Sequence, residues 1–371
     1  MFIEIFYLVP FALVPVVTSE FNISLLEASL LITVPSFLAL LMTIPAGFLA
    51  DRFKVNYLLG FSVSMQAIAM LLISQTNSYL ALLFFTSLMR ITLPFYHTAG
   101  LGCLAKTTDK EKMSKLAGFH NAFGNVGQAV GVITLGICLL TIGWRWAYLI
   151  WSIPALIWSY VVWASLKIDK EPPKRYEAED NGKLGRLSVV FPSLFLFLFV
   201  LAIREAGSTG AMTFMTTYFV DVRHLSQATA TLVLGLGPFI GIFGSLLGGH
   251  LGERFGPTKA LSHIILVCAA SLFMLSIADQ FYFLVIVYVV YSLFNSSAWA
   301  PINVIVANTS PSGSKGLGYS LSSLTEGIVA SLAPVLIAGV IQLSNSLWIV
   351  FPLSVIFMLV SIIVLQVFHR K

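Results

Sequence analysis

The chain has 371 residues, of which 58% are hydrophobic and only 10% are charged, and its mean hydropathy is +0.91. A soluble domain carries about 25% charged residues, so this chain lacks the polar side chains that a water-exposed body of this size requires. The composition excludes an ordinary soluble enzyme and predicts a multi-pass membrane protein. The net charge of +5 does not indicate nucleic-acid binding, because most basic residues lie in short connections between apolar segments.

Twelve apolar stretches are long enough to cross a bilayer, since a spanning helix needs about 20 mostly apolar residues. The first has no basic start and no small-residue cleavage site, so we interpret it as a spanning helix rather than a signal peptide. In chain order the stretches are 2–19, 26–50, 57–75, 78–101, 115–140, 145–167, 190–219, 227–250, 260–278, 281–304, 316–341 and 346–368.

One connection is longer and more polar than the others. Residues 168–187 are rich in charge and contain Pro172 and Pro173, which is typical of a solvated linker. We therefore expect two six-helix bundles, residues 1–167 and 188–371, joined by this linker.

The basic residues predict the orientation of the helices. Seventeen of the 21 Lys and Arg residues lie in alternate connections or at the C-terminal end, whereas only Arg145 and Arg223 lie on the opposite side. Because basic loops remain in the cytoplasm, we expect both termini and the linker to be cytoplasmic, in a plasma (cytoplasmic) membrane. The three cysteines lie far apart with no CxxC spacing, which favours neither a disulfide nor a metal site.

The two halves of the chain resemble each other. "GFLADRF" at 47–53 matches "GHLGERF" at 249–255 with an offset of 202 residues, and Trp146 and Trp348 share that offset. Gly127 and Gly327 match with an offset of 200. The repeat predicts a duplicated bundle with pseudo-two-fold symmetry. In proteins built this way, the substrate site lies near the bilayer midplane between the repeats.

These features together resemble the major facilitator superfamily over essentially the whole chain. The G-x-L-x-D-R-x-G-type phrase after helices 2 and 8 is the most specific element, although Lys54 replaces its usual glycine. The second copy has Glu253 for Asp and Pro257 where a basic residue is usual. The resemblance implies the all-α major facilitator fold. It also implies a monomeric secondary active transporter working by alternating access, which is not an enzyme and needs no cofactor or metal. Its partners would be the lipid bilayer, a small-molecule substrate and protons, with no nucleic acid.

A looser resemblance concerns one branch of that family. "FYHTAGLG" at 95–102 and "GFHNAFGNVGQAVG" at 118–131 resemble the fosmidomycin-resistance-like and drug–proton antiporter branch. That branch has His-Pro-Glu where this chain has His97, Thr98 and Ala99. The resemblance implies proton-coupled efflux of an amphipathic or drug-like compound.

Ionisable side chains inside predicted helices are the candidates for substrate binding or proton coupling, because they are costly in hydrocarbon. Burial favours the protonated form of a carboxylate, whereas a neighbouring arginine favours the charged form, and a proton-coupling site needs that competition. By family resemblance, helices 1, 4, 7 and 10 line a central cavity where four of these residues would converge. The candidates are Glu4, Arg90, His97, Arg204, Glu205 and Glu326.

Alternatives stay open for these residues. Glu4 could lie beside the lipid headgroups, and Arg90 could form a static ion pair. Arg204 and Glu205 are neighbours on a helix and point about 100° apart, so we expect one to be functional and the other structural. A second function follows from the arginines: Arg90 and Arg204 could clamp a small organic anion, a carboxylate or phosphate.

Two further groups of residues have expected structural roles. Gly124, Gly127 and Gly131 recur along helix 5 and predict close helix packing. By family resemblance, Asp51 would accept N–H groups at the start of helix 11, near Lys315, and act as a conformational latch with Arg52. Glu253 and Arg254 would form the counterpart latch against helix 5.

Overall fold

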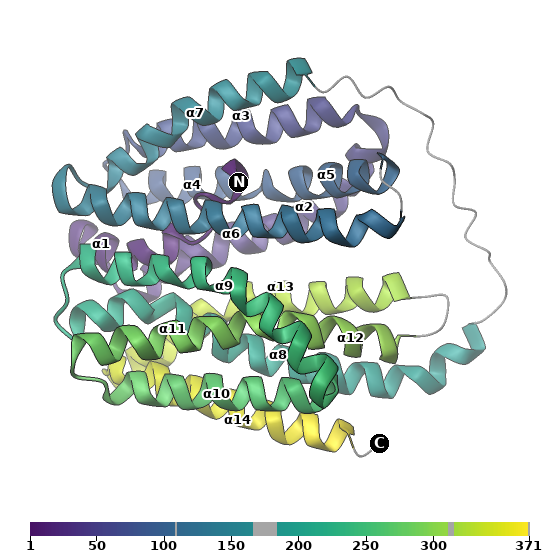
Figure 1. Cartoon of the computed structure of the whole chain (residues 1–371). Helices are drawn as coiled ribbons and strands as arrows, with labels where there is room; N and C mark the ends of the chain where they lie inside the picture. The colour runs from purple at the N-terminus through teal and green to yellow at the C-terminus, as the bar shows by residue number, and fades with distance from the viewer. Residues whose placement is uncertain (108–109, 166–183, 311–314, 370–371) are drawn as a thin grey trace. The chain divides into compact units, whose positions relative to one another are not determined.

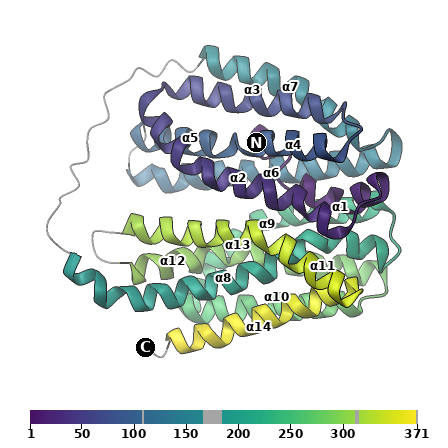
Figure 2. The same cartoon turned by 180° about the vertical axis from the view of Figure 1, so that it is seen from behind.

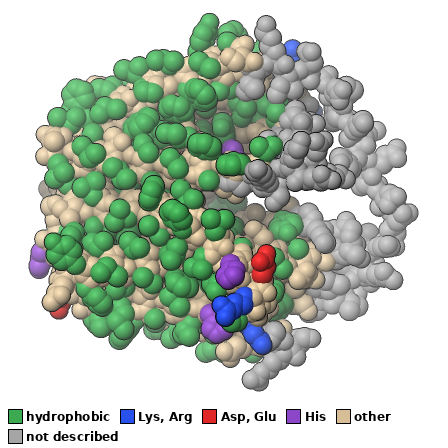
Figure 3. All heavy atoms as spheres, viewed as in Figure 1, with side chains coloured by type: hydrophobic (Ala, Val, Ile, Leu, Met, Phe, Trp, Pro, Cys, Tyr) green, Lys and Arg blue, Asp and Glu red, His purple; other side chains and the backbone are tan. Residues whose placement is uncertain are grey.

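The computed structural model describes residues 1–107, 110–165, 184–310 and 315–369, and these residues are almost entirely helical. Twelve helical segments are long and apolar enough to cross a membrane. They lie within a few residues of the predicted stretches, so the prediction of an all-α protein with twelve spans is confirmed. Much of the face seen in Figure 3 is covered by hydrophobic side chains, as a lipid-facing surface requires.

The chain divides into two compact units, Met1–Arg175 with His224–Gly235, and Tyr176–Arg223 with Leu236–Lys371. Within each unit the long helices run alongside one another (Figure 1). The predicted linker 168–187 lies mostly outside the described residues, so the domain boundary stays a prediction.

The first seven helices are η1 (Phe2–Glu4), α1 (Val9–Phe21), α2 (Leu25–Arg52), α3 (Val55–Ile73), α4 (Tyr79–Arg90), α5 (Leu93–Thr107) and α6 (Lys110–Thr141). The others are α7 (Trp144–Ser165), α8 (Leu184–Asp221), α9 (Gln227–Phe255), α10 (Pro257–Ile277), α11 (Phe281–Ser297), α12 (Trp299–Thr309), α13 (Lys315–Ser344), η2 (Leu347–Ile349) and α14 (Val350–His369).

Short-range signals explain several helix ends. At the start of α2, the Ser24 side chain accepts from the Glu27 backbone N–H at 3.2 Å, and the Glu27 carboxylate accepts from the Ser24 backbone at 2.7 Å. This capping box satisfies two N–H groups that have no partner inside the helix. Between α9 and α10, Gly256 has φ +79°, a conformation that a residue with a Cβ rarely adopts.

Three of the twelve spans in the described part of the chain contain a break between two helical elements, and we call these spans interrupted. Span 1 consists of η1 and α1, span 4 of α4 and α5, and span 10 of α11 and α12. Figure 2 shows α4 and α5 following each other end to end. Pro10, Pro94 and Pro301 lie in the first turn of α1, α5 and α12. A proline lacks an N–H and clashes with the carbonyl four residues earlier, but the first turn of a helix tolerates it.

Ion pairs join the ends of several spans. The Glu20 carboxylate accepts from Trp144 Nε1 and from Arg145 Nη2, both at 2.6 Å, while Arg145 Nε donates to the Thr76 carbonyl at 2.8 Å. In the second unit, Arg223 pairs with Asp279. Both arginines that the sequence assigns to the outer side therefore hold neighbouring helices together.

Candidate functional site

The first unit contains a buried carboxylate with two polar partners. Glu4 lies on η1 and is only 8% exposed. Its Oε1 atom lies 2.8 Å from His97 Nε2 on α5, and its Oε2 atom accepts from Gln128 Nε2 on α6 at 3.0 Å. The Glu4 carboxyl group and the His97 imidazole are therefore in direct hydrogen-bond contact, so a single proton can lie between them.

The position of Glu4 along the spans follows from its partner on α6. Its partner Gln128 is nine residues inside the span Phe119–Thr141. At a rise of 1.5 Å per residue, that is roughly 13 Å from the start of the span. Glu4 therefore contacts a residue well inside an apolar span, and its place relative to the lipid headgroups stays a prediction.

Arg90 is held by the interrupted part of span 1. Its Nη1 atom donates to the Tyr7 carbonyl at 3.3 Å, and its guanidinium carbon lies 3.8 Å from the centre of the Tyr7 ring. The charge of Arg90 also acts on Glu4. Among the described residues, however, no carboxylate forms an ion pair with Arg90. The static ion pair weighed in the sequence analysis is not found there.

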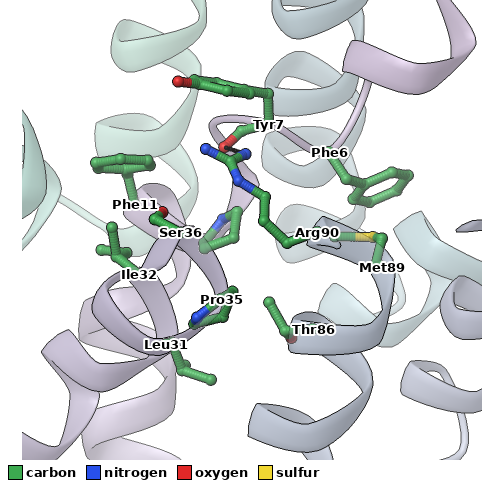
Figure 4. Close-up of a pocket in the computed structure, with 11 residues that line it drawn as sticks. Phe6, Tyr7, Phe11, Leu31, Ile32, Pro35, Ser36, Thr86, Met89 and Arg90 are labelled. Atoms are coloured by element: carbon green, nitrogen blue, oxygen red, sulfur yellow. Dashed lines mark hydrogen bonds between the residues drawn. The ribbon is translucent and has the colours of Figure 1, made fainter. Parts of the chain in front are cut away.

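A small, partly open hollow lies beside the Arg90 side chain (Figure 4). Its polar groups are the guanidinium of Arg90 and the side chains of Ser36 and Thr86. Apolar side chains from α1, α2 and α4 complete it, so a charged group entering it would meet one cation among mostly apolar side chains. The other lining residues are Phe6, Tyr7, Pro10, Phe11, Leu31, Ile32, Pro35 and Met89.

The second unit contains a buried arginine that, unlike Arg90, has a carboxylate partner. Arg204 on α8 is 5% exposed; it donates to Glu205 Oε2 at 3.3 Å and to Asn295 Oδ1 at 2.9 Å. It also donates to the Asn295 backbone carbonyl at 3.4 Å, just before the interruption of span 10. Neighbouring side chains on a helix were expected to point apart, yet Arg204 and Glu205 meet. The carbon stems of both are long enough to bend together.

Glu205 and Glu326 differ in their partners. Glu205 Oε1 accepts from Thr209 at 2.7 Å, in addition to the ion pair with Arg204. Glu326 on α13 is close enough for its charge to interact with Glu205 and Arg204. Within the described part of the chain, the Glu326 carboxyl group has no hydrogen-bond partner.

Side chains of α11 and of the start of α12 differ in their exposure. Tyr288 and Tyr291 are fully buried, whereas Trp299 is 54% exposed. Asn295 accepts from Arg204 and, at 3.1 Å, from Ser208.

Two of the predicted packing glycines contact the first residues of the chain. A Cβ atom on Gly127 would lie 2.5 Å from the Met1 carbonyl oxygen, and one on Gly131 would lie 1.8 Å from the Ile5 carbonyl oxygen. At Gly124 a Cβ would lie at an ordinary 3.5 Å from the Glu4 side chain. The glycines of α6 thus allow the backbone that carries Glu4 to approach the helix.

The predicted latch residues lie at two helix ends. Arg52 is the last residue of α2, and Glu253 and Arg254 lie in the last turn of α9, with both side chains exposed. The Arg254 guanidinium lies 5.3 Å from the Phe255 ring. The Asp51 side chain lies outside the described residues. The latch, and the convergence of candidates from both halves, stay predictions.

Sequence reasoning missed three partners of the candidate residues. Gln128 lies in the glycine-rich part of α6. A single amide side chain among glycines and apolar residues could have marked it as a partner for a buried charged group. Tyr7 binds Arg90 through its backbone carbonyl and its ring, and neither contact can be assigned without knowing which segments pack together. Asn295 could only have been assigned to Arg204 through contact information.

Twelve spans, interrupted helices and buried ionisable groups define a membrane transporter rather than a soluble or structural protein. A family model described as Major Facilitator Superfamily matches residues 2–334 and, in a second match, residues 243–371. The chain belongs to the major facilitator superfamily, and its fold is the major facilitator fold.

The individual proteins that this chain resembles share only about a quarter or less of its residues. The "Probable nitrate transporter NarT" of Staphylococcus epidermidis is 21% identical over 371 residues, covering 97% of this chain and 91% of the relative. A "Probable sugar efflux transporter" of Haemophilus influenzae is 25% identical over 285 residues, covering 72% of this chain and 65% of the relative. The crystal structure of a bacterial homologue of the human lysosomal transporter Spinster has a TM-score of 0.78 at 16% identity, covering 100% of this chain and 94% of that one. This last likeness concerns the fold alone.

Proposed function

We propose that this transporter carries a small anion by alternating access, that Arg90 binds the anion, and that Glu4 with His97 couples transport to protons. The observation that carries the proposal is the state of Arg90. Its guanidinium is bound by a carbonyl and an aromatic ring but has no carboxylate partner among the described residues. An arginine cannot lose its charge in a protein, so an anion is the natural partner for it in the apolar layer.

Arg204 differs from Arg90 in this respect. Its charge is balanced by Glu205, and its remaining N–H groups bind Asn295. We therefore revise the idea of a two-arginine clamp: Arg90 takes the anion, and Arg204 holds α8 to the interrupted span 10. The name of the Staphylococcus relative, a probable nitrate transporter, supports an anionic substrate class.

Coupling to protons rests on the geometry around Glu4. The carboxylate is buried and touches His97, whose side chain is 34% exposed. A proton that neutralises Glu4 changes the charge next to Arg90, since the charges of these two residues interact. Binding of an anion at Arg90 and loading of a proton at Glu4 are then linked through one electrostatic field.

Replacing Arg90 with alanine should strongly reduce nitrate transport into proteoliposomes under an imposed pH gradient. Loss of one partner of a desolvated charge pair costs about 2 kcal/mol or more, which corresponds to roughly 30-fold weaker binding. Arg90→Lys keeps the charge but loses the planar donor fork, so its defect should be smaller. Lys259→Ala, which changes an exposed basic residue outside the hollow and the latch, is the control. Nitrate transport by Arg90→Ala with the wild-type KM and rate would contradict the proposal.

A second candidate is efflux of an amphipathic or drug-like compound, with protons exchanged. The apolar lining of the hollow beside Arg90 favours it. Competition separates the two candidates. Movement of neutral or cationic amphiphiles without competition by nitrate or carboxylates would reject the anion and support efflux of amphiphiles.

We also propose that Asp51 acts in the conformational latch. Asp51→Ala should slow turnover several-fold while leaving substrate affinity unchanged. Asp51 lies near the end of α2, fifteen residues (roughly 22 Å of helix) beyond Ser36, which borders the Arg90 hollow. Comparing transport rates with equilibrium binding of nitrate measures this split. Lys54→Ala, in the same connection, is the control. Weaker binding together with normal turnover would argue for a substrate-binding role instead.

A further inference from the structure

We propose that His120 is the entry residue of a proton path that leads to Glu4, and that it passes protons to His97. The proposal rests on the proposed function, because it takes Glu4 as the group that loads the proton. His120 is not required by the binding site described above. It contacts neither the Arg90 hollow nor, by a direct hydrogen bond among the described residues, Glu4 itself.

Position along α6 separates His120 from the carboxylate. His120 is the second residue of the span Phe119–Thr141, whereas Gln128, which binds Glu4, lies eight residues further on. Eight residues of helix correspond to about 12 Å. A proton that reaches Glu4 from this end of the span needs groups that can carry it inwards, because an isolated charge is costly away from water.

The imidazole of His97 lies between these two points. Its ring centre is 5.7 Å from that of His120, the two rings meet edge to face at 83°, and its Nε2 atom is 2.8 Å from Glu4. A separation of this size suits one bridging water molecule between the two imidazoles. Both imidazoles are partly exposed while Glu4 is buried, so water is more accessible on the histidine side of the path.

Among the described residues, α5 and the first segment bring titratable or charged groups close to His120. From α5, the Tyr96 ring stacks on it at 6.2 Å and His97 faces it. From the first segment, the charges of Glu4 and of the Met1 amino group act on it. Imidazole is the side chain whose ordinary titration lies nearest neutral pH, so it can accept and release a proton within one transport cycle. The stack on Tyr96 holds its ring towards His97.

The test measures proton loading itself and needs no substrate. After a pH jump on purified protein in liposomes, time-resolved infrared spectroscopy follows the band of the protonated carboxyl that is absent in Glu4→Gln. His120→Phe keeps an aromatic ring on Tyr96 but carries no proton, and His120→Ala leaves space for a small buffer. We expect both variants to load Glu4 roughly 10-fold or more slowly, with unchanged final amplitude.

Chemical rescue separates a relay from a structural role. Added imidazole should restore the rate in His120→Ala but not in His120→Phe, and His263→Ala on α10 should behave like the wild type. Loading of His120→Phe at the wild-type rate, or failure of imidazole to restore His120→Ala, would overturn the path. If the wild type shows no carboxyl band that Glu4→Gln removes, the proposed coupling site fails and the path fails with it. A normal band with normal rates in the His120 variants rejects the path alone.

Discussion

Glu4→Gln is expected to abolish proton-coupled transport while leaving substrate exchange intact. The substitution keeps the size of the side chain and a carbonyl oxygen near His97 and Gln128, but it removes the group that loads and releases the proton. General acid–base groups contribute about 100-fold or more to the steps that they serve. We therefore expect uphill transport driven by a pH gradient to fall by at least that factor. Exchange of nitrate across the membrane without a gradient should continue.

The measurement compares both activities in the same proteoliposomes. Glu27→Gln is a matched control, because it makes the same chemical change in the capping box of α2, where glutamine also serves at the third helical position. It should leave both activities unchanged. Uphill transport by Glu4→Gln at the wild-type rate would remove Glu4 from the coupling mechanism. Loss of exchange as well would assign Glu4 to the substrate site.

Gly131→Ala is expected to destabilise the first unit and to reduce coupling, although alanine favours a helix. In a helix interior, alanine is better than glycine by about 1 kcal/mol. At Gly131, however, the new Cβ would lie 1.8 Å from the Ile5 carbonyl oxygen and 2.7 Å from its carbonyl carbon. Backbone atoms cannot yield as a flexible side chain can, so η1 must move. Overpacking of this kind costs about 1–3 kcal/mol, and the movement takes Glu4 away from His97.

Gly47→Ala on α2 is the control, since no heavy atom lies within 4 Å of the position of its Cβ. It should be neutral or slightly stabilising in thermal unfolding, whereas Gly131→Ala should unfold at a lower temperature. Gly131→Ala should also weaken the infrared signature of Glu4 protonation. Equal stability of the two variants would mean that the first segment is not held against α6.

Proline shows where sequence reasoning about the helices was limited. Pro10, Pro94 and Pro301 mark the interruptions of spans 1, 4 and 10. Pro35 and Pro154, by contrast, lie inside continuous helices. The residue type is the same in both situations. Whether a helix breaks depends on whether neighbouring groups can bind the carbonyl that the proline leaves free, and that depends on packing.

The contacts within the candidate site could not be predicted from the sequence either. Glu4, Arg90, His97, Arg204, Glu205 and Glu326 could be selected from the sequence, because ionisable groups in apolar segments are rare. Their pairing could not. Glu4 meets a histidine 93 positions away and a glutamine 124 positions away, and Arg204 binds Asn295 at a separation of 91. Nothing local to any of these residues specifies such distant partners.

The sequence by itself determined the twelve spans and their all-helical character, because apolar length and backbone hydrogen bonding in lipid permit few alternatives. Only the tertiary structure decided that Arg90 lacks a carboxylate partner among the described residues while Arg204 has one. The two arginines look alike in the sequence. The physical reason for the difference is burial: in the apolar layer, the state of a charge is set by the few groups that packing brings within hydrogen-bond distance.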